Sequence, residues 1–415
     1  MAVSLASDPQ EGPILAPPRH AGRTSDGDDA VQVPALVIVD FLAGFLLVFD
    51  RFPLPGLGQP AGILVLAGLV GLAAFRRRTV RLTALAPIVV LYAAMLGWAV
   101  AVSEFYALDW HQRATKMLLL FVFALAVATG RVAARYLLMG LTLGLVLNAV
   151  AFYAGVTPNA YPPYLTGFLG DKNVAGLFLG VLALLGLALY RSWRWQLLHL
   201  LVFGTMVWLT GSRTSIAGVL AGLVWFLLRN RTWLMARMAL IPVLVWALNV
   251  VESRYARVGE FADREGTDWF RQQIELATAN KLALSPWWGN GLTTAFVNLD
   301  NGRFMYFHDS YAALRIEGGW PMVVLMLVLV LGYAGGLLRE EKVKRELAMV
   351  EGALVVMLVC AWKLGEVFFT TPAFLLLGLA WGMRFGTSAD PVGPAPWVAK
   401  RAAARGQGVR VRSAA

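Results

Sequence analysis

The chain has 415 residues, 58% of them hydrophobic and only 15% charged, with a mean hydropathy of +0.64. Soluble domains usually carry about 25% charged residues, so this composition excludes a single soluble domain and indicates a polytopic membrane protein. The one cysteine, Cys360, cannot form an internal disulfide, and arginines in cytoplasmic loops explain the net charge of +11 without nucleic acid as a partner.

Apolar segments that are long enough, or nearly long enough, to cross a bilayer recur along most of the chain. The sequence therefore predicts an all-α polytopic membrane protein with about 12 transmembrane helices. The first 32 residues are polar and contain no apolar core of a cleavable signal peptide. The expected spans are 33–49, 56–75, 84–102, 116–130, 136–155, 174–190, 195–210, 216–229, 234–250, 320–338, 349–364 and 367–384.

These spans divide the chain into five parts. An N-terminal tail covers 1–32, helices 1–9 fall within 33–250, and one large loop covers 251–310. The last three helices fall within 311–384, and a basic tail rich in Ala, Gly and Pro covers 385–415. Such a tail can lie against anionic lipid.

Basic residues alternate with the spans. They cluster in the loops after the second, fourth, sixth, eighth and tenth spans, and the positive-inside bias places those loops and both tails in the cytoplasm. The large loop is then periplasmic. The basic residues are Arg76, Arg77, Arg78, Arg81, Arg131, Arg135, Arg191, Arg194, Arg229, Arg231, Arg237, Arg339, Lys342, Lys344 and Arg345.

Within the large loop, residues 267–284 read TDWFRQQIELATANKLAL. Their apolar side chains recur at helical spacing, which predicts an amphipathic helix lying over the bundle. The next residues, SPWWGNGL, contain Pro286, Gly289 and Gly291 and predict an irregular turn beside the membrane interface.

Residues 307–322 read FHDSYAALRIEGGWPM and place titratable side chains just before an apolar run. Ionisable groups at such positions are candidates for function. His308 is the candidate proton acceptor, and Arg315 would share its helix face. Glu317 would point the other way and pair with another helix, which Gly318 and Gly319 would allow to approach closely.

Arg213 lies in LTGSRTSIAG, a short outer loop between the seventh and eighth expected spans. Ser212 or Thr214 would cap the following helix, whose N–H groups favour anions. An arginine adds a planar donor fork that matches phosphate oxygens. The alternative interpretation is an arginine that extends to the interface. Arg271 lies in the amphipathic segment, where arginines are more often part of a solvated face.

A third candidate stretch is LTGFLGDKNVAG, residues 165–176. Its glycines, Lys172 and Asn173 lead into the sixth span, as in some phosphate-binding turns, but the pattern is no Walker motif. The alternative is an ordinary helix start capped by Asp171 or Asn173.

Charged residues also precede the fourth span. Arg113 and Lys116 follow Glu104, Asp109 and His111 in an outer loop. The cations either line a cavity for an anion or anchor the helix at the interface. His111 competes with His308 as a candidate base.

Cations and one histidine on the outer face fit a lipid-linked phosphate substrate. The chain has no His/Cys cluster with metal-ligand spacing, and its one Asp-x-Asp triplet, Asp26 to Asp28, lies in the cytoplasmic tail. A polyprenyl diphosphate sugar carries its own leaving group once arginines neutralise the charge. The reaction then needs a base and no second carboxylate. We therefore expect glycosyl transfer without a metal or another cofactor.

At these residues the chain resembles the O-antigen ligase family, within the superfamily of bacterial polysaccharide ligases and polymerases. The family pattern is His, usually Asn, Ser or Gln, nine residues, and Gly. Here His308 and Gly319 fit the spacing, while Asp309 departs from the usual second residue and Met322 from the small or hydroxyl residue that often follows. The resemblance covers most of the membrane region.

Further motifs carry the same resemblance. Arg213 matches an arginine in a Ser-Arg-Thr turn, Arg271 matches an arginine before a Pro-x-x-Gly-x-Gly turn, and Asn173 matches a Gly…Asn stretch. The resemblance implies that His308 is the base and that Arg213 and Arg271 hold the diphosphate. The supporting candidates are Asn173, Lys172, Arg315, Glu317 and Asp309.

The resemblance also implies the reaction. The enzyme would transfer O-antigen from undecaprenyl diphosphate to lipid A–core, with inversion and without a metal. The transfer would take place at the periplasmic face of a Gram-negative inner membrane, among membrane lipids. An O-antigen polymerase, with the same donor and a second lipid-linked glycan as acceptor, is the nearest alternative. A transporter or flippase for a lipid-linked anion is an alternative of another class, and it predicts repeats or broken helices at mid-membrane.

Overall fold

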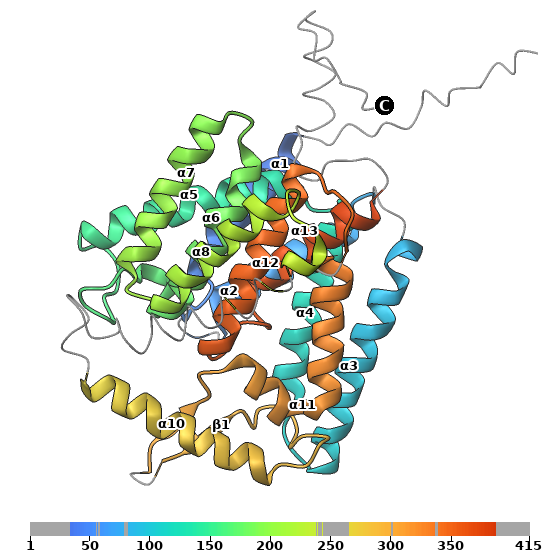
Figure 1. Cartoon of the computed structure of the whole chain (residues 1–415), viewed down its shortest axis with the longest axis vertical. Coiled ribbons are helices and arrows are strands. Elements are labelled where there is room, and N and C mark those ends of the chain that lie inside the picture. The colour runs from blue at the N-terminus through green and yellow to red at the C-terminus, as the bar shows by residue number, and fades with distance from the viewer. Residues whose placement is uncertain are drawn as a thin grey trace, which may run out of the picture.

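The computed structural model describes residues 34–54, 56, 59–78, 82–237, 239, 243, 265–299, 302–336 and 339–386. The expected tails, most of the expected span 234–250 and the first part of the large loop lie outside these residues. The chain is mostly helical (Figure 1). The boundaries of the five parts expected from the sequence (two tails, two groups of helices and one large loop) stay predictions.

Helices account for nearly all of the regular structure. They are α1 (Pro34–Leu46), α2 (Ala61–Ala74), α3 (Ala86–Phe105), α4 (His111–Ala128), α5 (Ala134–Tyr153), α6 (Lys172–Leu185), α7 (Trp193–Leu209), α8 (Arg213–Leu228), α10 (Glu265–Leu284), α11 (Ser310–Leu327), α12 (Arg345–Lys363) and α13 (Thr371–Phe385). Short 3-10 helices extend several of them, and a π-helical stretch, Val328–Gly335, continues α11.

Five described stretches of helix are long and apolar enough to cross a membrane. Shorter apolar helices cover Val37–Phe49, Ala61–Ala74 and Arg213–Leu228. These helices fit a membrane protein, as the composition predicts, and the expected number of spans stays a prediction. The five stretches are Leu82–Phe105, His111–Ala128, Ala134–Tyr153, Lys172–Leu189 and Ser310–Gly335.

Helices α12 and α13 form the interior of the bundle (Figure 1). Helix α12 packs against α6 and α8, and α13 packs against α4. A Cβ on Gly222 of α8 would lie only 2.5 Å from the carbonyl oxygen of Gly352 in α12. Small residues therefore set the close helix contacts, as is usual where packing and not water drives helix association.

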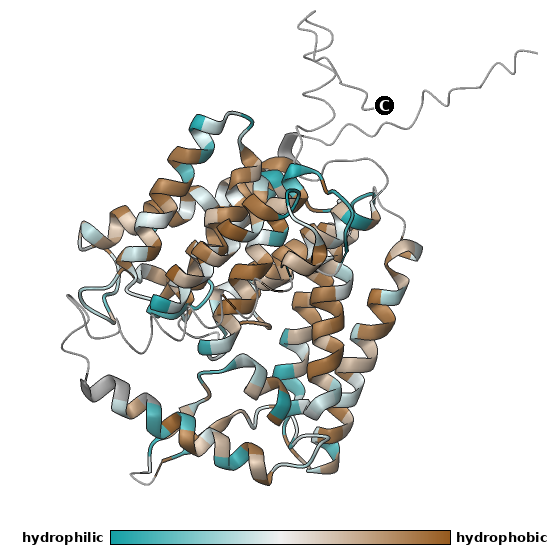
Figure 2. Cartoon of the chain, in the orientation of Figure 1, coloured by the Kyte–Doolittle hydropathy of each residue, from teal (hydrophilic) through white to brown (hydrophobic). Residues whose placement is uncertain are grey.

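The outer helices present large apolar side chains to their surroundings. Val90 on α3, Val150 on α5 and Leu201 on α7 are each exposed by 60% or more. Figure 2 shows the hydrophobic colour along most of the length of these helices. Exposed apolar faces of this size suit contact with lipid.

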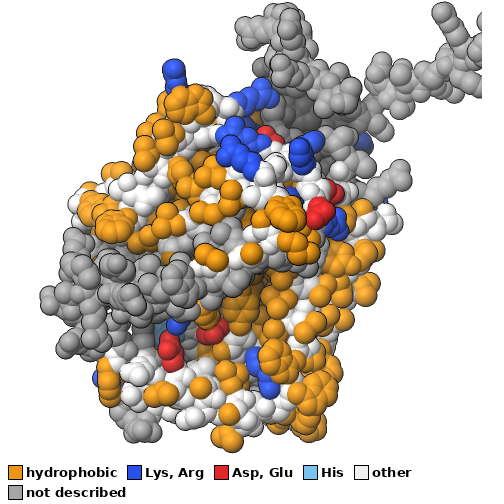
Figure 3. All heavy atoms as spheres, viewed as in Figure 1, with side chains coloured by type: hydrophobic (Ala, Val, Ile, Leu, Met, Phe, Trp, Pro, Cys, Tyr) orange, Lys and Arg blue, Asp and Glu red, His pale blue; other side chains and the backbone are white. Residues whose placement is uncertain are grey.

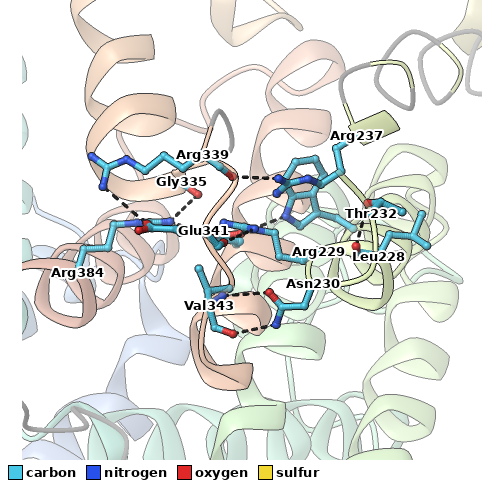
Figure 4. A network of polar contacts seen from close by, with 12 residues as sticks. Leu228, Arg229, Asn230, Thr232, Arg237, Gly335, Arg339, Glu341, Val343 and Arg384 are labelled. Carbon is cyan, nitrogen blue, oxygen red and sulfur yellow. Dashed lines mark hydrogen bonds and ion pairs between the residues drawn. The ribbon is translucent and has the colours of Figure 1, made fainter. Parts of the chain in front are cut away.

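Basic side chains gather at the end of the bundle away from α10 (Figure 3). Arg229, at the end of α8, and Arg384 of α13 both donate to the fully buried carboxylate of Glu351 in α12. Arg237 donates to the carbonyl oxygen of Arg339 at 2.9 Å (Figure 4). Buried charges need such partners, so this network joins three helices at that end.

Helix α11 corrects the expected span 320–338. It begins at Ser310, because the Asp309 carboxylate accepts the backbone N–H groups of Tyr311 and Ala312 and so caps the helix. The helix kinks at Gly319, whose φ is 69°. Residues 310–318, which were expected to precede the span, thus form the first half of a bent helix.

The purely helical expectation is also wrong in one place. Strand β1 (Phe296–Asn298) pairs antiparallel with β2 (Phe304–Tyr306), with Phe296 opposite Tyr306. Aromatic residues are frequent in these segments, and Asn301-Gly302 lies between them. Both features favour a hairpin.

Candidate functional site

His308 lies directly before α11, at the end of the bundle that carries α10, and is half-buried. The next turn is fixed by Ser310, whose hydroxyl donates to the carbonyl oxygen of Gly365 at 2.7 Å and lies 2.8 Å from that of Leu364. The same hydroxyl accepts the N–H of Val367 at 3.0 Å. The segment that holds His308 is therefore docked on the connection that follows α12.

Arg213 is the first residue of α8 and is half-buried. Ser212 occupies the capping position but makes no capping bond to the backbone; its hydroxyl lies 2.8 Å from that of Ser215. Ser212 is thus the N-cap residue, one of the two expected, but without the side-chain bond of a cap. The Ser215 hydroxyl is also 3.9 Å from the sulfur of Cys360 in α12. The first turn of α8 thus lies beside the last turn of α12.

Arg271 lies in α10, and the structure describes its backbone but not its side chain. One turn later, Glu275 pairs with Lys363, the last residue of α12, with 3.6 Å between Oε1 and Nζ. Ile274 packs in a small buried cluster with Phe307, the neighbour of His308. Helix α10 therefore contacts both the end of α12 and the start of α11.

Three segments that are far apart in sequence consequently meet around the last turn of α12. They hold Arg213, Arg271 and His308. In Figure 1 the starts of α8 and α11 both lie on the side of the bundle that faces α10. Figure 3 shows acidic and basic side chains and part of a histidine side by side in the recess above α10.

The start of α6 lies beside the start of α8. A Cβ on Gly176 would be 2.4 Å from the hydroxyl oxygen of Ser215, so the first turns of the two helices touch. Both helices point their N–H groups toward the same end of the bundle. Helix N-termini favour negative charge, and that of α8 has no side-chain cap, which suits it to an anion.

Lys172 and Asn173 lie in the first turn of α6. The Asp171 carboxylate accepts the N–H groups of Asn173 at 2.8 Å and Val174 at 3.1 Å, so Asp171 is the cap. The Lys172 ammonium lies 5.0 Å from the centre of the Tyr164 ring. The same ring lies against Gly211, two residues before Arg213, so this capped helix start places a cation beside the turn that leads into α8.

Asp309 caps α11 and lies close to Lys363 and Glu275. Burial raises the pKa of Asp309 above its ordinary value of 3.8, against the opposing effects of the capped N–H groups and the Lys363 ammonium. The residue that departs from the family pattern therefore serves as a helix cap.

Arg315 and Glu317 do not point toward a common partner. Arg315 donates to the carbonyl oxygens of Pro286 at 2.7 Å and Ser285 at 3.3 Å, and so holds the turn after α10. Glu317 is buried and pairs with Arg113 of α4 at 3.1 Å. The expectation that Glu317 pairs with another helix is confirmed.

Arg113 and Lys116 take part in an ion network and are not simple interface anchors. Arg113 donates to both Glu317 and Glu366, and Lys116 donates to Glu366 at 3.2 Å. Burial alone would raise the pKa of Glu366, but the charges of Arg113 and Lys116 outweigh it and hold this pKa at about 2. Arg113 and Lys116 are thus both paired with carboxylates of the protein.

The other described histidines differ from His308. The side chain of His111 is 75% exposed and lies 3.3 Å from Asp109, outside the three converging segments. His199 is buried within α7, 2.9 Å from the carbonyl oxygen of Leu182 and stacked on Phe203. Among the described residues, no three His, Cys, Asp or Glu side chains group as a metal site would need.

Sequence reasoning passed over three ionisable residues at this end of the bundle. They are Glu275, Lys363 and Glu366, which connect α10, α12 and α4. Glu366 stands in the short connection between the last two expected spans, so its position near a span end was the available signal. Its partner Arg113 is 253 positions away in the chain, and no local pattern links the two.

This arrangement can bind an anion and accept a proton. Arg213, Lys172 and the N-terminus of α8, which has no side-chain cap, supply positive potential, and His308 supplies a ring nitrogen in the same region. No family model matches the chain, and no curated protein matches it either. The family resemblance therefore rests on the motifs alone.

Proposed function

We propose that this protein is a polyprenyl-diphosphate-dependent glycosyltransferase of the O-antigen ligase type. It transfers O-antigen from undecaprenyl diphosphate to a sugar of lipid A–core, with inversion and without a metal. In this proposal about 12 helices cross the inner membrane of a Gram-negative bacterium. The α10 end of the bundle faces the periplasm, because the basic loops lie at the other end.

The observation that carries this proposal is the meeting of three segments around the last turn of α12. Arg213, Arg271 and His308 come from α8, α10 and the start of α11, and each segment contacts residues 360–367. Such a convergence is what a reaction needs if a diphosphate must be held while a hydroxyl proton is removed.

The chemistry then divides between the cations and the base. Arg213 and Arg271 hold the diphosphate and stabilise its charge as the bond between the sugar C1 and the phosphate oxygen breaks. The acceptor hydroxyl attacks C1 from the opposite face, which gives inversion. His308 takes the hydroxyl proton, and the diphosphate leaves as an anion.

The test is transfer by the purified protein in nanodiscs. The substrates are undecaprenyl-diphosphate glycan and lipid A–core, with a chelator present. A glycan-bearing lipid A–core product is expected. Elongated lipid-linked glycan from donor alone would identify a polymerase, and movement of intact donor across a vesicle bilayer, without any new glycosidic bond, would replace the proposal with a transporter.

A further inference from the structure

A groove of mixed polar and apolar lining runs between the end of α10 and strand β1. Its volume is about 440 Å³, within the range of about 300–1,000 Å³ that is usual for small-molecule sites. One wall is the last turns of α10, and the other is formed by residues 290 and 296–298. The polar and aromatic residues along it are Asn280, Lys281, Ser285, Asn290, Phe296 and Asn298.

The walls of the groove are held in place by hydrogen bonds. The Lys281 ammonium donates to the carbonyl oxygens of Thr294 and Phe296, each at 2.7 Å, and so joins α10 to the opposite wall. The Ser285 hydroxyl donates to the carbonyl oxygen of Lys281 at 2.6 Å and accepts from the Asn290 amide at 3.2 Å. These bonds hold the two walls of the groove together, and the Lys281 ammonium is already hydrogen-bonded to one of them.

The groove keeps hydrogen-bonding capacity free. Asn280 and Asn298, on opposite walls, are both exposed, so their amides can bind a ligand in the groove. No carboxylate lines the groove. Amides and a hydroxyl beside an aromatic ring suit an uncharged ligand rich in hydroxyl groups.

The groove also adjoins the candidate site. The Lys281 ammonium lies 5.9 Å from the centre of the Phe307 ring, and Phe307 directly precedes His308. Helix α10 carries the groove near one end and Arg271 nearer the other. A glycan whose reacting end is at His308 can therefore extend from there along α10.

We propose that this groove binds uncharged sugar residues of a glycan substrate, next to the reacting end. This inference deepens the proposed function and rests on it. Each amide can donate to one sugar hydroxyl and accept from another. Sugars held here bind equally in the ground state and the transition state, so the groove acts on KM and not on kcat.

Direct binding is measured first, without any transfer. Soluble neutral oligosaccharides, released from the donor lipid or from the lipid A–core acceptor, are titrated into the wild-type protein in nanodiscs by calorimetry. One of the two is expected to bind, and this identifies the source of the sugar. The double variant Asn280→Ala/Asn298→Ala should bind about tenfold or more weakly, since it lacks two hydrogen-bonding groups. Both residues are exposed, so the melting temperature should not change.

The matched control is Asn159→Ala, which removes an exposed asparagine outside the groove and should bind like the wild type. Asn280→Trp, which fills the groove, should block binding. In the transfer reaction, the double variant should raise KM about tenfold for the matching substrate only, with kcat unchanged.

Failure of the groove and failure of the proposed function give different results. Wild-type binding of neither oligosaccharide, or unchanged binding and KM in the double variant, would overturn the groove while leaving transfer intact. Absence of transfer by the wild type, together with oligosaccharide binding that depends on Asn280 and Asn298, would overturn the proposed reaction while supporting the sugar site.

Discussion

Arg113 of α4 and Glu317 of α11 form a buried ion pair across 204 positions of sequence, with 3.1 Å between Nη2 and Oε2. The other oxygen of Glu317 accepts the N–H of Thr293 at 3.2 Å, and Arg113 also binds Glu366. One carboxylate therefore ties a core helix to the turn after α10, directly before the kink in α11. This relationship fixes the end of the bundle on which the candidate site is built.

Glu317→Gln should destabilise the protein by about 3 kcal/mol, because it leaves a buried arginine with one carboxylate fewer. The measurement is thermal or denaturant unfolding in detergent. The control is Glu275→Gln, which breaks a pair whose carboxylate is 57% exposed and should cost under about 1 kcal/mol. Equal losses in the two variants would show that burial of the Glu317 pair does not matter.

Glu366 should give the wild type a distinct acid sensitivity. Its pKa of about 2 lies below its ordinary value of 4.5, so the ionised form stabilises the fold. That contribution is fully present above about pH 4.5 and is lost as the pH falls from there toward about 2. Melting temperatures across this window should fall more for the wild type than for Glu366→Gln. Parallel curves would contradict the assigned charge effect.

His308→Ala should abolish most transfer, by about 10²–10⁴-fold, because the acceptor hydroxyl loses its base. The protein should still insert and melt normally, since this side chain is only half-buried. His111→Ala, at an exposed position outside the converging segments, should keep normal activity. Normal transfer by the His308 variant would remove the imidazole from the mechanism.

Arg213→Lys should impair transfer nearly as much as Arg213→Ala, because a point charge cannot reproduce a bidentate grip on phosphate. Initial rates with saturating acceptor measure the effect. Arg191→Lys makes the same change at an exposed position in the connection before α7 and should have no effect. If the Arg213→Lys variant works nearly as well as wild type, the two-point grip is wrong.

Gly319→Ala should destabilise the protein by several kcal/mol. Its φ of 69° is unfavourable for alanine, and the added Cβ would lie 2.1 Å from the carbonyl oxygen of Trp287. Gly332→Ala is the control, since its nearest atom would be 3.9 Å away. Similar unfolding curves for the two variants would show that the kink tolerates a side chain.

Local sequence was sufficient to predict those features that depend on one segment alone, such as a helix, its cap or a turn. Apolar length predicted helices, Asp171 was among the predicted caps, and the helical spacing in 267–284 predicted α10. The glycines at 289 and 291 adopt the positive φ values of an irregular turn, as SPWWGNGL predicts. The pairing of Glu317 away from the His308 face also followed from helix geometry.

What the sequence alone determined is the apolar, mostly helical character of the chain and the small set of polar motifs near helix ends, because both depend on neighbouring residues. The tertiary structure decided which motifs meet: Glu317 and Glu366 bind Arg113, Arg315 binds the turn after α10, and the starts of α8 and α11 meet at the end of α12. Those contacts join residues that are tens to hundreds of positions apart. They are set by helix packing in three dimensions, which no local spacing specifies.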